Sequence, residues 1–312
     1  MEKIIIDCDP GHDDAIELLL AVTTGKRTGK VDLIGVTTVA GNSEGEHTVK
    51  NALKVLNFAG IQDIPVYAGC SQPMMRKLYR LTGELIHGSD GLGGPVLPEP
   101  VQQPEEMHAV DYLIKTLRSA AEKITVITSG PLTNLAAAFV LAPDIKKNIN
   151  RIISMGGAVL DPGNITSAAE FNIYVDPEAA KIVFDSGCEI YLNTLDVTMK
   201  ALISKPEIDE LVHSPQKLQR LIGEFLTFFE HTHEEHFGIS ACPVHDALNV
   251  AILIDPDIVK FQHVFLDVST HDELTVGETV ADLWGITGKA PNVHISIEVD
   301  STKFIRMIKE IQ

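Results

Sequence analysis

The sequence predicts an α/β fold in which an open, mostly parallel β-sheet is flanked by helices. Short apolar runs alternate along the chain with longer helical patterns. This alternation is typical of parallel sheets covered by helices on both faces. Polar and glycine residues follow the short runs, and in such folds ligands bind beyond the carboxyl ends of the strands. We therefore expect a functional site at that edge of the sheet.

The predicted strands are five short apolar runs and two later ones. They cover Lys3–Asp7, Val31–Thr38, Ile124–Thr128, Arg151–Met155, Glu189–Asn193, Val264–Val268 and Val293–Val299. The predicted helices cover Asp13–Val22, His47–Ala59, Ala109–Ala121, Thr133–Leu141 and Pro177–Asp185, with a closing helix from Ser301. The residues between strands and helices include Ala40-Gly41-Asn42, Ser129-Gly130-Pro131 and Met155-Gly156-Gly157.

The organisation of the chain indicates one domain spanning residues 1–312. No linker rich in Gly and Ser, no low-complexity tract and no internal repeat interrupts the pattern. From about residue 204 to residue 238 the pattern becomes helical without strands. We expect these helices to form a lobe over the sheet edge and the active site.

The composition argues against two classes of partner. Hydrophobic residues make up 45% of the chain, and 25 basic against 43 acidic residues give a formal net charge of −18. Such a charge repels nucleic-acid phosphates and anionic lipids, so neither nucleic acid nor membrane is an expected partner. No signal peptide and no bilayer-length apolar run is evident. The four cysteines lie far apart, which is typical of reduced thiols in a cytoplasmic protein.

A cluster of acidic residues follows the first predicted strand. Asp7-Cys8-Asp9-Pro10-Gly11-His12-Asp13-Asp14 places four carboxylates within one strand-to-helix turn, where they would repel one another if unpaired. Asp13 is well placed to cap the following helix. A capping residue with solvated neighbours accounts for one or two of these carboxylates but not for four, and a bound hard cation, calcium or magnesium, accounts for the rest.

Several familiar motifs are excluded by position. An EF-hand loop that began at Asp7 or Asp9 would end at Leu18 or Leu20 instead of Glu. The phosphotransferase pattern Asp-x-Asp-x-Thr/Val fails at Gly11, and the chain has neither a P-loop nor a GxGxxG turn. The HExxH zinc pattern that begins at His233 fails because Phe237 occupies its last position.

Three further segments carry residues suited to chemistry. His245 and Asp246 lie in Pro243-Val244-His245-Asp246-Ala247, ahead of a helical pattern, and could serve as a proton donor and a metal ligand or be structural. Asn164, Glu170 and Asn172 suit binding of sugar hydroxyls, although turns use the same residue types. His87 lies in a glycine-dense loop, where it could close over a ligand or be idle.

Taken together, these motifs resemble the inosine-uridine-preferring nucleoside hydrolase family, and the resemblance runs nearly end to end. The aspartate cluster combined with the distant His245-Asp246 pair is the specific part, and the glycine turns are not specific. The resemblance implies a Rossmann-like fold, a homo-oligomer (tetramer or dimer) and calcium-dependent hydrolysis of the N-glycosidic bond of ribonucleosides.

Carried over position by position, the resemblance implies a role for each motif residue. Calcium would be held by Asp9, Asp14, Asp246 and the backbone carbonyl of Ser129. Ribose-contacting positions would be Asp13, Asn42, Asn164, Glu170 and Asn172. Asp9 would be the general base toward a metal-bound water. Leaving-group positions would be His245 and His87.

One departure concerns the proton donor to the nucleobase. Phe237 stands where pyrimidine-preferring relatives typically have a tyrosine, and phenylalanine cannot relay a proton. His233 or His236 could substitute, so the donor and the preferred base stay open. Two alternatives to a nucleoside hydrolase are a calcium-dependent nucleoside- or ribose-binding protein without turnover and a magnesium-dependent phosphohydrolase. The binding protein would need neither Asp9 as base nor His245.

Overall fold

A computed structural model describes residues 1–79, 86–88, 90–238 and 240–312. Among these residues, one large sheet has the strand order β10-β9-β11-β6-β5-β4-β1-β2-β3. Its strands are β1 (Glu2–Cys8), β2 (Val31–Thr38), β3 (Val66–Ala68), β4 (Ile124–Thr128), β5 (Ile149–Met155), β6 (Ile190–Asn193), β9 (Val259–Val268), β10 (Thr279–Asp282) and β11 (Val293–Val299). All neighbours pair in parallel except β9, which pairs antiparallel with both β10 and β11. The predicted open, mostly parallel sheet is confirmed.

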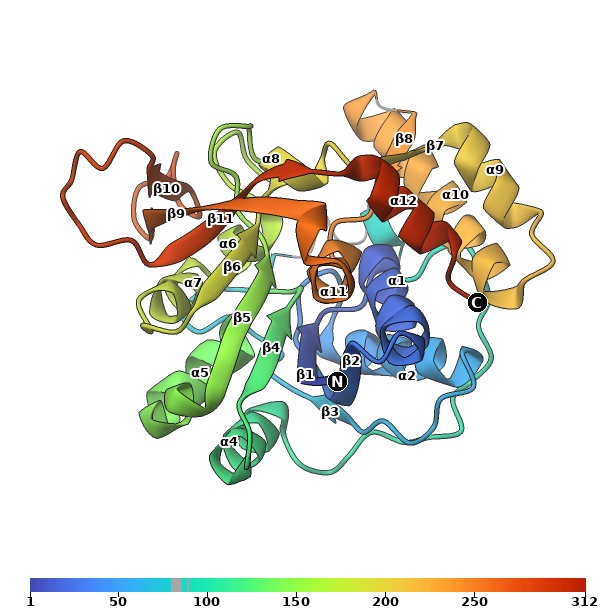
Figure 1. Cartoon of the computed structure of the whole chain (residues 1–312), viewed down its shortest axis with the longest axis horizontal. Coiled ribbons are helices and arrows are strands. Elements are labelled where there is room, and N and C mark those ends of the chain that lie inside the picture. Colours follow the sequence, from blue (N-terminus) through green and yellow to red (C-terminus); the bar gives the residue numbers. More distant parts are fainter. Residues whose placement is uncertain (80–85, 89, 239) are drawn as a thin grey trace.

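Helices cover both faces of this sheet (Figure 1). They are α1 (His12–Leu20), α2 (Gly45–Phe58), α4 (Ala109–Ser119), α5 (Thr133–Leu141), α6 (Phe171–Val175), α7 (Pro177–Phe184), α8 (Leu195–Thr198), α9 (Lys205–Val212), α10 (Lys217–Phe237), α11 (Ala247–Ile254) and α12 (Ser301–Lys309). Short 3-10 or π turns cover Ala21–Gly25, Pro143–Asn148 and Pro256–Ile258.

Two hydrophobic cores lie on opposite faces of the sheet. Side chains alternate along a strand, so Ile4 and Ile6 of β1 join one core and Ile5 joins the other. The first core contains buried residues of α1, α2, α10, α11 and α12, and the second contains those of α4, α5 and α7. In the first core α1 packs against α11, which brings an early and a late segment of the chain together.

The structure differs from the sequence prediction at short elements and at one helix cap. The edge strands β3 and β10 were not predicted, and neither was the small two-stranded antiparallel sheet of β7 (Leu202–Ser204) and β8 (Ala241–Pro243). The prediction that Asp13 caps α1 is wrong, because Gly11 is the N-cap residue and Asp13 lies in the first turn. The carboxylate that accepts the N–H of Gly11, at 2.9 Å, belongs to Asp14.

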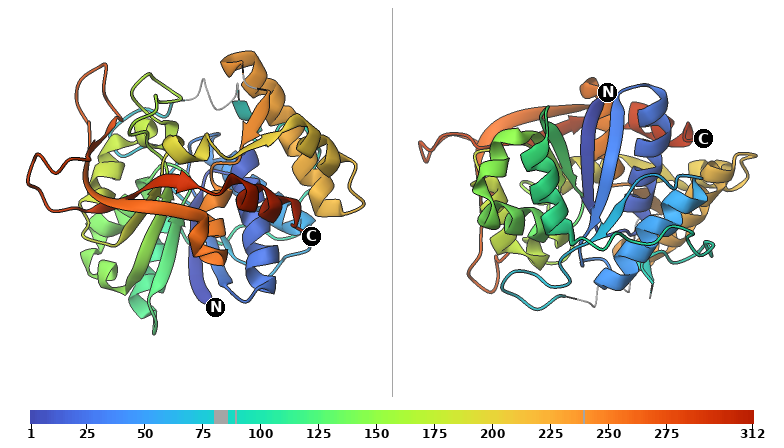
Figure 2. Two further views of the ribbon diagram at one scale, coloured as in Figure 1. Left: turned by 45° about the horizontal axis from the view of Figure 1, so that its top comes forward. Right: turned by 90° about the horizontal axis from the view of Figure 1, so that it is seen from below.

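The segment predicted to form a helical lobe contains α9 and α10, which lie together at one side of the sheet (Figure 2). Ser204 and Glu207 form a capping box that starts α9. Helix α10 ends at Gly238, whose left-handed φ of 68° is favourable for glycine. Within the described part of the chain, no helix has the length and apolarity needed to cross a bilayer.

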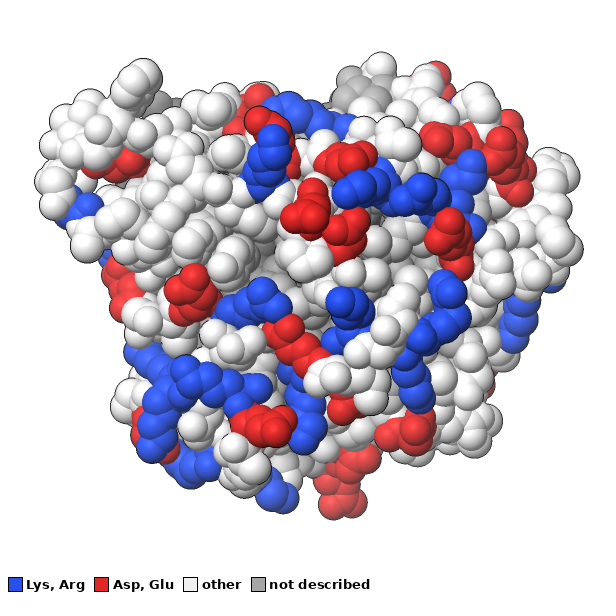
Figure 3. Space-filling model, viewed as in Figure 1, with Lys and Arg blue, Asp and Glu red and all other residues white. Residues whose placement is uncertain are grey.

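The formal charge of −18 is not carried by the surface alone. Figure 3 shows acidic and basic side chains intermixed on one face of the molecule. Many acidic residues are instead buried: Asp7, Asp9, Asp13, Asp14, Glu17, Glu170, Asp176, Asp196, Glu230 and Asp246. Most of them follow strands or begin helices near one edge of the sheet, and this edge holds the site described next.

Candidate active site

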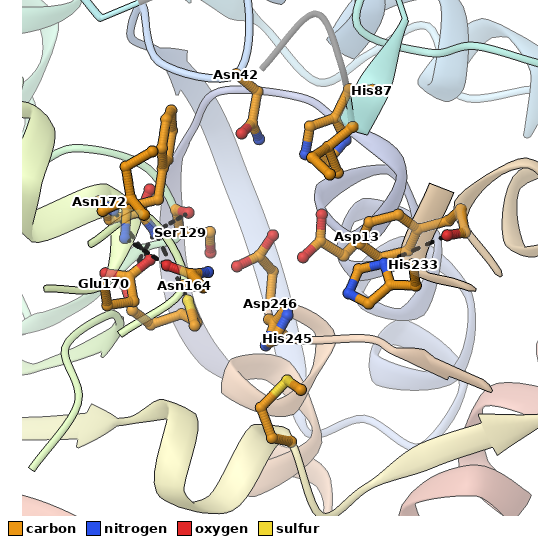
Figure 4. A pocket seen from close by; sticks show the side chains of 16 residues that line it. Asp13, Asn42, His87, Ser129, Asn164, Glu170, Asn172, His233, His245 and Asp246 are labelled. Atoms are coloured by element: carbon orange, nitrogen blue, oxygen red, sulfur yellow. Dashed lines mark hydrogen bonds between the residues drawn. The ribbon is translucent and has the colours of Figure 1, made fainter. Parts of the chain in front are cut away.

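A cavity of about 100 Å³ opens beyond the carboxyl ends of the parallel strands. Its polar lining comes from segments far apart in the sequence: Asp13, Asn42, His87, Ser129, Asn164, Glu170, Asn172, His233, His245 and Asp246. In Figure 4, Asn164, Glu170 and Asn172 lie on one side, His87 and His233 on the other, and Asp13 and Asp246 between them. The cavity thus has an amide and carboxylate wall opposite a histidine wall.

Three buried carboxylates meet at this cavity, with Asp13 and Asp246 in its lining and Asp14 directly behind it. Oxygen atoms of Asp13, Asp14 and Asp246 lie within 4.8 Å of one another. Asp13 and Asp14 belong to the first turn of α1, and Asp246 is the N-cap residue of α11. Because α1 packs against α11, residues more than two hundred positions apart in sequence become neighbours.

Asp9 lies next to this cluster without lining the cavity. It is fully buried, its Oδ2 accepts the backbone N–H of Asn42 at 2.6 Å, and its own N–H donates to Asp14 Oδ1 at 3.2 Å. Among the described residues its Oδ1 has no hydrogen-bond partner. A buried carboxylate oxygen without a hydrogen-bond partner costs free energy. Such an oxygen therefore indicates that Asp9 has a functional role in this site.

The electrostatics of the cluster favour an added positive charge. Burial is the largest cause that raises the pKa of Asp9, Asp13 and Asp246, and it raises that of Asp14 to about 7. Repulsion among the neighbouring carboxylates adds to this effect at Asp9, Asp14 and Asp246. Ionising these groups together without a counter-charge is unfavourable, and a cation removes that penalty.

Ser129, directly after β4, is held by a buried hydrogen-bond chain. Its hydroxyl donates to Glu17 Oε2 at 2.7 Å and accepts from Asn249 Nδ2 at 3.1 Å. Its backbone carbonyl accepts from Asn172 Nδ2 at 2.9 Å. These contacts fix the Ser129 carbonyl oxygen at the cavity wall, where it can serve as an additional neutral oxygen ligand.

The amide and carboxylate wall is positioned by the start of α6. Glu170 is the N-cap residue, and its carboxylate accepts backbone N–H groups of Asn172 and Gly157, both at 2.9 Å, and of Ile173 at 3.3 Å. Burial outweighs these bonds and raises the Glu170 pKa to about 7. Asn164 Oδ1 accepts the N–H of Phe171 at 2.9 Å, so a short loop and a helix start present three polar side chains together.

The histidine wall is buried and partly apolar. His245 Nδ1 lies 2.7 Å from Thr198 Oγ1, and His233 Nδ1 lies 3.3 Å from the carbonyl of Phe229. Burial lowers the pKa of His245 to about 3 and that of His87 well below its ordinary value. Apolar side chains complete this part of the lining: Ile86, Met155, Ile165, Phe171, Met199 and Phe229.

The donor set fits a hard cation. All candidate ligands are oxygens, three carboxylates lie within reach of one ion, and Asp9 adds a free buried oxygen beside them. Calcium and magnesium prefer such ligands, whereas zinc and copper favour nitrogen and sulfur. The exposed side chains of His231, Glu234 and Glu235 do not line the cavity.

The predicted site residues are brought to one place, with two exceptions in detail. Asp9 and Asp14 lie behind the lining, whereas the other predicted positions form it. The side chains of His236 and Phe237 lie outside the described part of the structure, so the departure at Phe237 has no structural counterpart here. Sequence reasoning missed Thr198, Met199 and Phe229, whose only signal is helical spacing, with Phe229 one turn before His233.

Comparison with known proteins agrees with this geometry. Residues 4–306 match the profile of the inosine-uridine preferring nucleoside hydrolases. The chain is 41% identical over 308 residues to a pyrimidine-specific ribonucleoside hydrolase RihA of Salmonella gallinarum, covering 98% of this chain and 97% of that protein. The RihA of an Escherichia coli strain is 39% identical over the same length.

Solved structures show the same fold. A purine-preferring ribonucleoside hydrolase from Gardnerella vaginalis superposes with a TM-score of 0.91 at 29% identity, covering 99% of this chain and 97% of that chain. A plant nucleoside hydrolase, PpNRh1, superposes with a TM-score of 0.91 at 32% identity, covering 99% and 98%. The chain therefore belongs to the inosine-uridine preferring nucleoside hydrolase family and is a hydrolase that acts on the N-glycosidic bond of ribonucleosides.

Proposed function

We propose that this enzyme performs ribonucleoside hydrolysis at a calcium site formed by Asp9, Asp14, Asp246 and the Ser129 carbonyl. The observation that carries the proposal is the meeting of three buried carboxylates at one cavity, Asp13 and Asp246 in its lining and Asp14 directly behind it. When bound, the cation would supply positive charge that binds the sugar hydroxyls and lowers the pKa of a water molecule. The oxygen-only donor set supports calcium or magnesium, and calcium suits an irregular set of carboxylates better.

Asp9 is proposed as the general base. Its Oδ2 is held by the Asn42 N–H, so the carboxylate cannot rotate freely, while Oδ1 is left without a partner among the described residues. A fixed carboxylate with one free oxygen can accept a proton from an attacking water. Burial and repulsion raise its pKa, which makes it a stronger base than a solvated aspartate.

The ribose is proposed to lie between the carboxylate cluster and the start of α6. Asp13, Asn42, Asn164, Glu170 and Asn172 would hydrogen-bond its hydroxyls. Loss of the nucleobase leaves positive charge on the sugar ring, and Asp13 and Glu170 lie where carboxylates would stabilise that charge. Holding the hydroxyls from two sides also aligns the sugar with the base Asp9.

The nucleobase is proposed to face His87, His233 and His245 with the apolar wall around it. Phe229 and Met199 offer flat or adaptable surfaces for the ring, and the histidines offer polar contacts at its edge. His245 is the proposed donor to the departing base. Since burial lowers its pKa, full proton transfer requires the substrate complex to favour the charged ring.

We further propose that the protein forms a homo-oligomer, either a tetramer or a dimer, and that it is cytoplasmic. We also propose that residues 1–312 form a single domain. All four cysteines are free in the structure, which supports a reducing compartment. One continuous sheet running from β3 to β10 supports the single domain.

The proposal is tested by measuring reducing-sugar release from inosine, uridine, cytidine, adenosine and guanosine. The enzyme is expected to release ribose, to lose this activity in chelator, and to regain it with calcium and not with zinc. Full activity in chelator would contradict the metal site. Nucleoside binding without any turnover would instead favour a binding protein.

A further inference from the structure

His12 faces the proposed active-site residue His87 from behind. The Nδ1 atoms of the two rings lie 3.1 Å apart, and the rings are stacked with centroids 5.2 Å apart. His12 is fully buried and does not line the cavity. Building on the proposed function, we infer that His12 is a positioning residue that fixes which nitrogen of His87 carries the proton, so that His87 offers a lone pair to the nucleobase.

The tautomer follows from a contact on the far side of His12. Its Nε2 lies 2.9 Å from the backbone carbonyl of Gly93. A carbonyl oxygen only accepts, so His12 Nε2 carries the proton and, in a neutral ring, His12 Nδ1 is bare. His87 Nδ1 must then donate to His12 Nδ1, which leaves His87 Nε2 as the bare nitrogen.

A weaker contact favours the opposite tautomer of His87. The backbone N–H of His12 is directed at His87 Nδ1 at 3.5 Å, which would suit a bare Nδ1 on His87. A hydrogen bond of that length is marginal. The opposite tautomer would set two lone pairs against each other across the 2.9 Å between His12 Nε2 and the Gly93 carbonyl. The shorter contact, between His12 Nε2 and the Gly93 carbonyl, therefore determines the tautomers of both rings.

The surroundings of His12 favour an uncharged ring. Phe225, Phe228 and Phe229 enclose it, with ring centroids 5.8, 5.2 and 5.5 Å away. An apolar enclosure of this kind disfavours a charged ring.

The glycine-dense loop is built around this pair. A Cβ on Gly11 would lie 2.6 Å from His87 Nδ1, so glycine is needed for the ring to approach α1. His12 binds the loop at Gly93, and Asn51 Nδ2 donates to the carbonyl of Asp90 at 2.7 Å. These contacts hold the Asp90 and Gly93 carbonyls in place and set the hydrogen-bond polarity at His87.

His87 and His245 then have different roles toward the nucleobase. His87 Nε2 makes no hydrogen bond to a described residue, and the side chain lines the cavity. As an acceptor it can hold an N–H group of the nucleobase but cannot donate a proton. Of His87 and His245, only His245 can then donate, because its partner, the Thr198 hydroxyl, can donate or accept and imposes no tautomer.

The direct test is nitrogen NMR of the full-length, calcium-loaded protein with ¹⁵N-labelled histidine. Long-range correlations report which nitrogen of each ring is protonated, and His87 is assigned by loss of its signal in a His87→Ala variant. We expect His87 to be protonated at Nδ1 and bare at Nε2. Protonation of His87 at Nε2 would overturn the inference.

Two matched substitutions separate hydrogen-bond polarity from loop anchoring. His12→Asn keeps an acceptor at the Nδ1 position and loses the Gly93 contact, whereas His12→Gln keeps a donor toward Gly93 and loses the acceptor. We expect His12→Asn to retain the His87 Nδ1 proton and His12→Gln to lose it. Phe225→Leu, which loosens the enclosure and removes no partner of either hydrogen bond, should leave the tautomer unchanged.

Kinetics supply a second readout. In His12→Gln, kcat/KM for uridine should fall about tenfold, the effect of one hydrogen bond, while p-nitrophenyl riboside changes less than about threefold. His12→Asn should restore uridine turnover to within about threefold of the parent. If His12→Gln instead of His12→Asn kept uridine turnover near that of the parent, His12 would act only by anchoring the loop at Gly93. That result would overturn the inference. Absence of any turnover in the parent would contradict the proposed function and leave the NMR result standing.

Discussion

The carboxylate of Asp9 is held by the backbone N–H of Asn42, at 2.6 Å from Oδ2, while Oδ1 has no hydrogen-bond partner among the described residues. Asp9 follows β1 and Asn42 follows β2, and the two strands are parallel neighbours. Two adjacent strand ends thus orient one carboxylate and leave one of its oxygens available.

This arrangement depends on a glycine beside Asn42. A Cβ on Gly41 would lie 2.0 Å from Asp9 Oδ2, so Gly41→Ala should displace the carboxylate. We expect kcat/KM for uridine to fall by about 100-fold or more, the effect of a misplaced catalytic group. Gly45→Ala is the matched control, since its Cβ would meet nothing closer than 3.7 Å. Equal activity in the two variants would show that Asp9 has no such role.

Asp246 should be required for the cation. Calcium at a hundredfold excess over its dissociation constant should stabilise the parent by about 2.7 kcal/mol, which raises Tm by roughly 4 °C for a chain of 312 residues. Asp246→Asn should reduce this shift and weaken calcium binding by at least about tenfold, measured by calorimetry. Asp111→Asn, which changes an exposed aspartate of α4, should leave the shift intact. An undiminished shift in Asp246→Asn would place the cation elsewhere.

His245→Ala should discriminate between leaving groups. A nucleobase leaves poorly without a proton, so kcat/KM for uridine should fall by about 100-fold or more. Hydrolysis of p-nitrophenyl riboside, whose leaving group needs no proton, should fall by less than about tenfold. His213→Ala, on the surface, serves as the control. Equal losses on both substrates would argue against the donor role.

Sugar hydroxyls are proposed to carry much of the binding. Because the ribose faces the carboxylate cluster and the start of α6, 2′-deoxyuridine should be hydrolysed at least about 100-fold more slowly than uridine. Steady-state assays with both nucleosides at the same enzyme concentration measure this ratio. Comparable rates would mean that the 2′-hydroxyl is not held.

Glu170 should make stability depend on pH in the chelated enzyme. Its folded pKa of about 7 lies above the ordinary value for glutamate, so folding favours the protonated form. This contribution is fully present below about pH 4, the range of unfolded glutamate, and is lost as pH rises through about 7.

Glu170→Gln keeps one acceptor oxygen, which can still accept the N–H groups of Gly157 and Ile173, and it removes the ionisation. The lost acceptor toward Asn172 is a cost that does not depend on pH. The variant's free energy of unfolding relative to the parent should therefore rise by roughly 2–3 kcal/mol between pH 5 and pH 8. Urea unfolding in chelator at both values measures the difference, with exposed Glu224→Gln as the control. A difference independent of pH would contradict the raised pKa.

Much of the fold could be predicted because its signals are local. The ranges Val31–Thr38, Ile124–Thr128, Thr133–Leu141 and Val293–Val299 were predicted with the bounds that the structure has. The strands β3, β7, β8 and β10 were missed, because runs of three or four residues at an edge carry too little periodicity. The cap of α1 was assigned to Asp13 because spacing alone does not show which carboxylate turns back to Gly11.

The sequence could predict which residues form the site but not how their side chains are arranged in space. Asp14 and Asp246 could be chosen from their residue types and motif context, yet Asp13 joins them in the cluster of three and Asp9 lies behind it. Thr198 contacts His245 and Phe229 contacts His233, and the only sequence signal for either residue is helical spacing, which does not show what it touches. Such contacts depend on how helices pack, which no local window contains.

By itself, the sequence determined the alternation of strands and helices, the oxygen-rich chemistry that follows the strands, and the family resemblance, because each is written in neighbouring residues. Only the tertiary structure decided that α11 brings Asp246 to α1, that Asp9 lies beside Gly41, and that His12 faces His87. Distances between residues far apart in the chain follow from strand order and helix packing, and these arise only when the whole core is assembled.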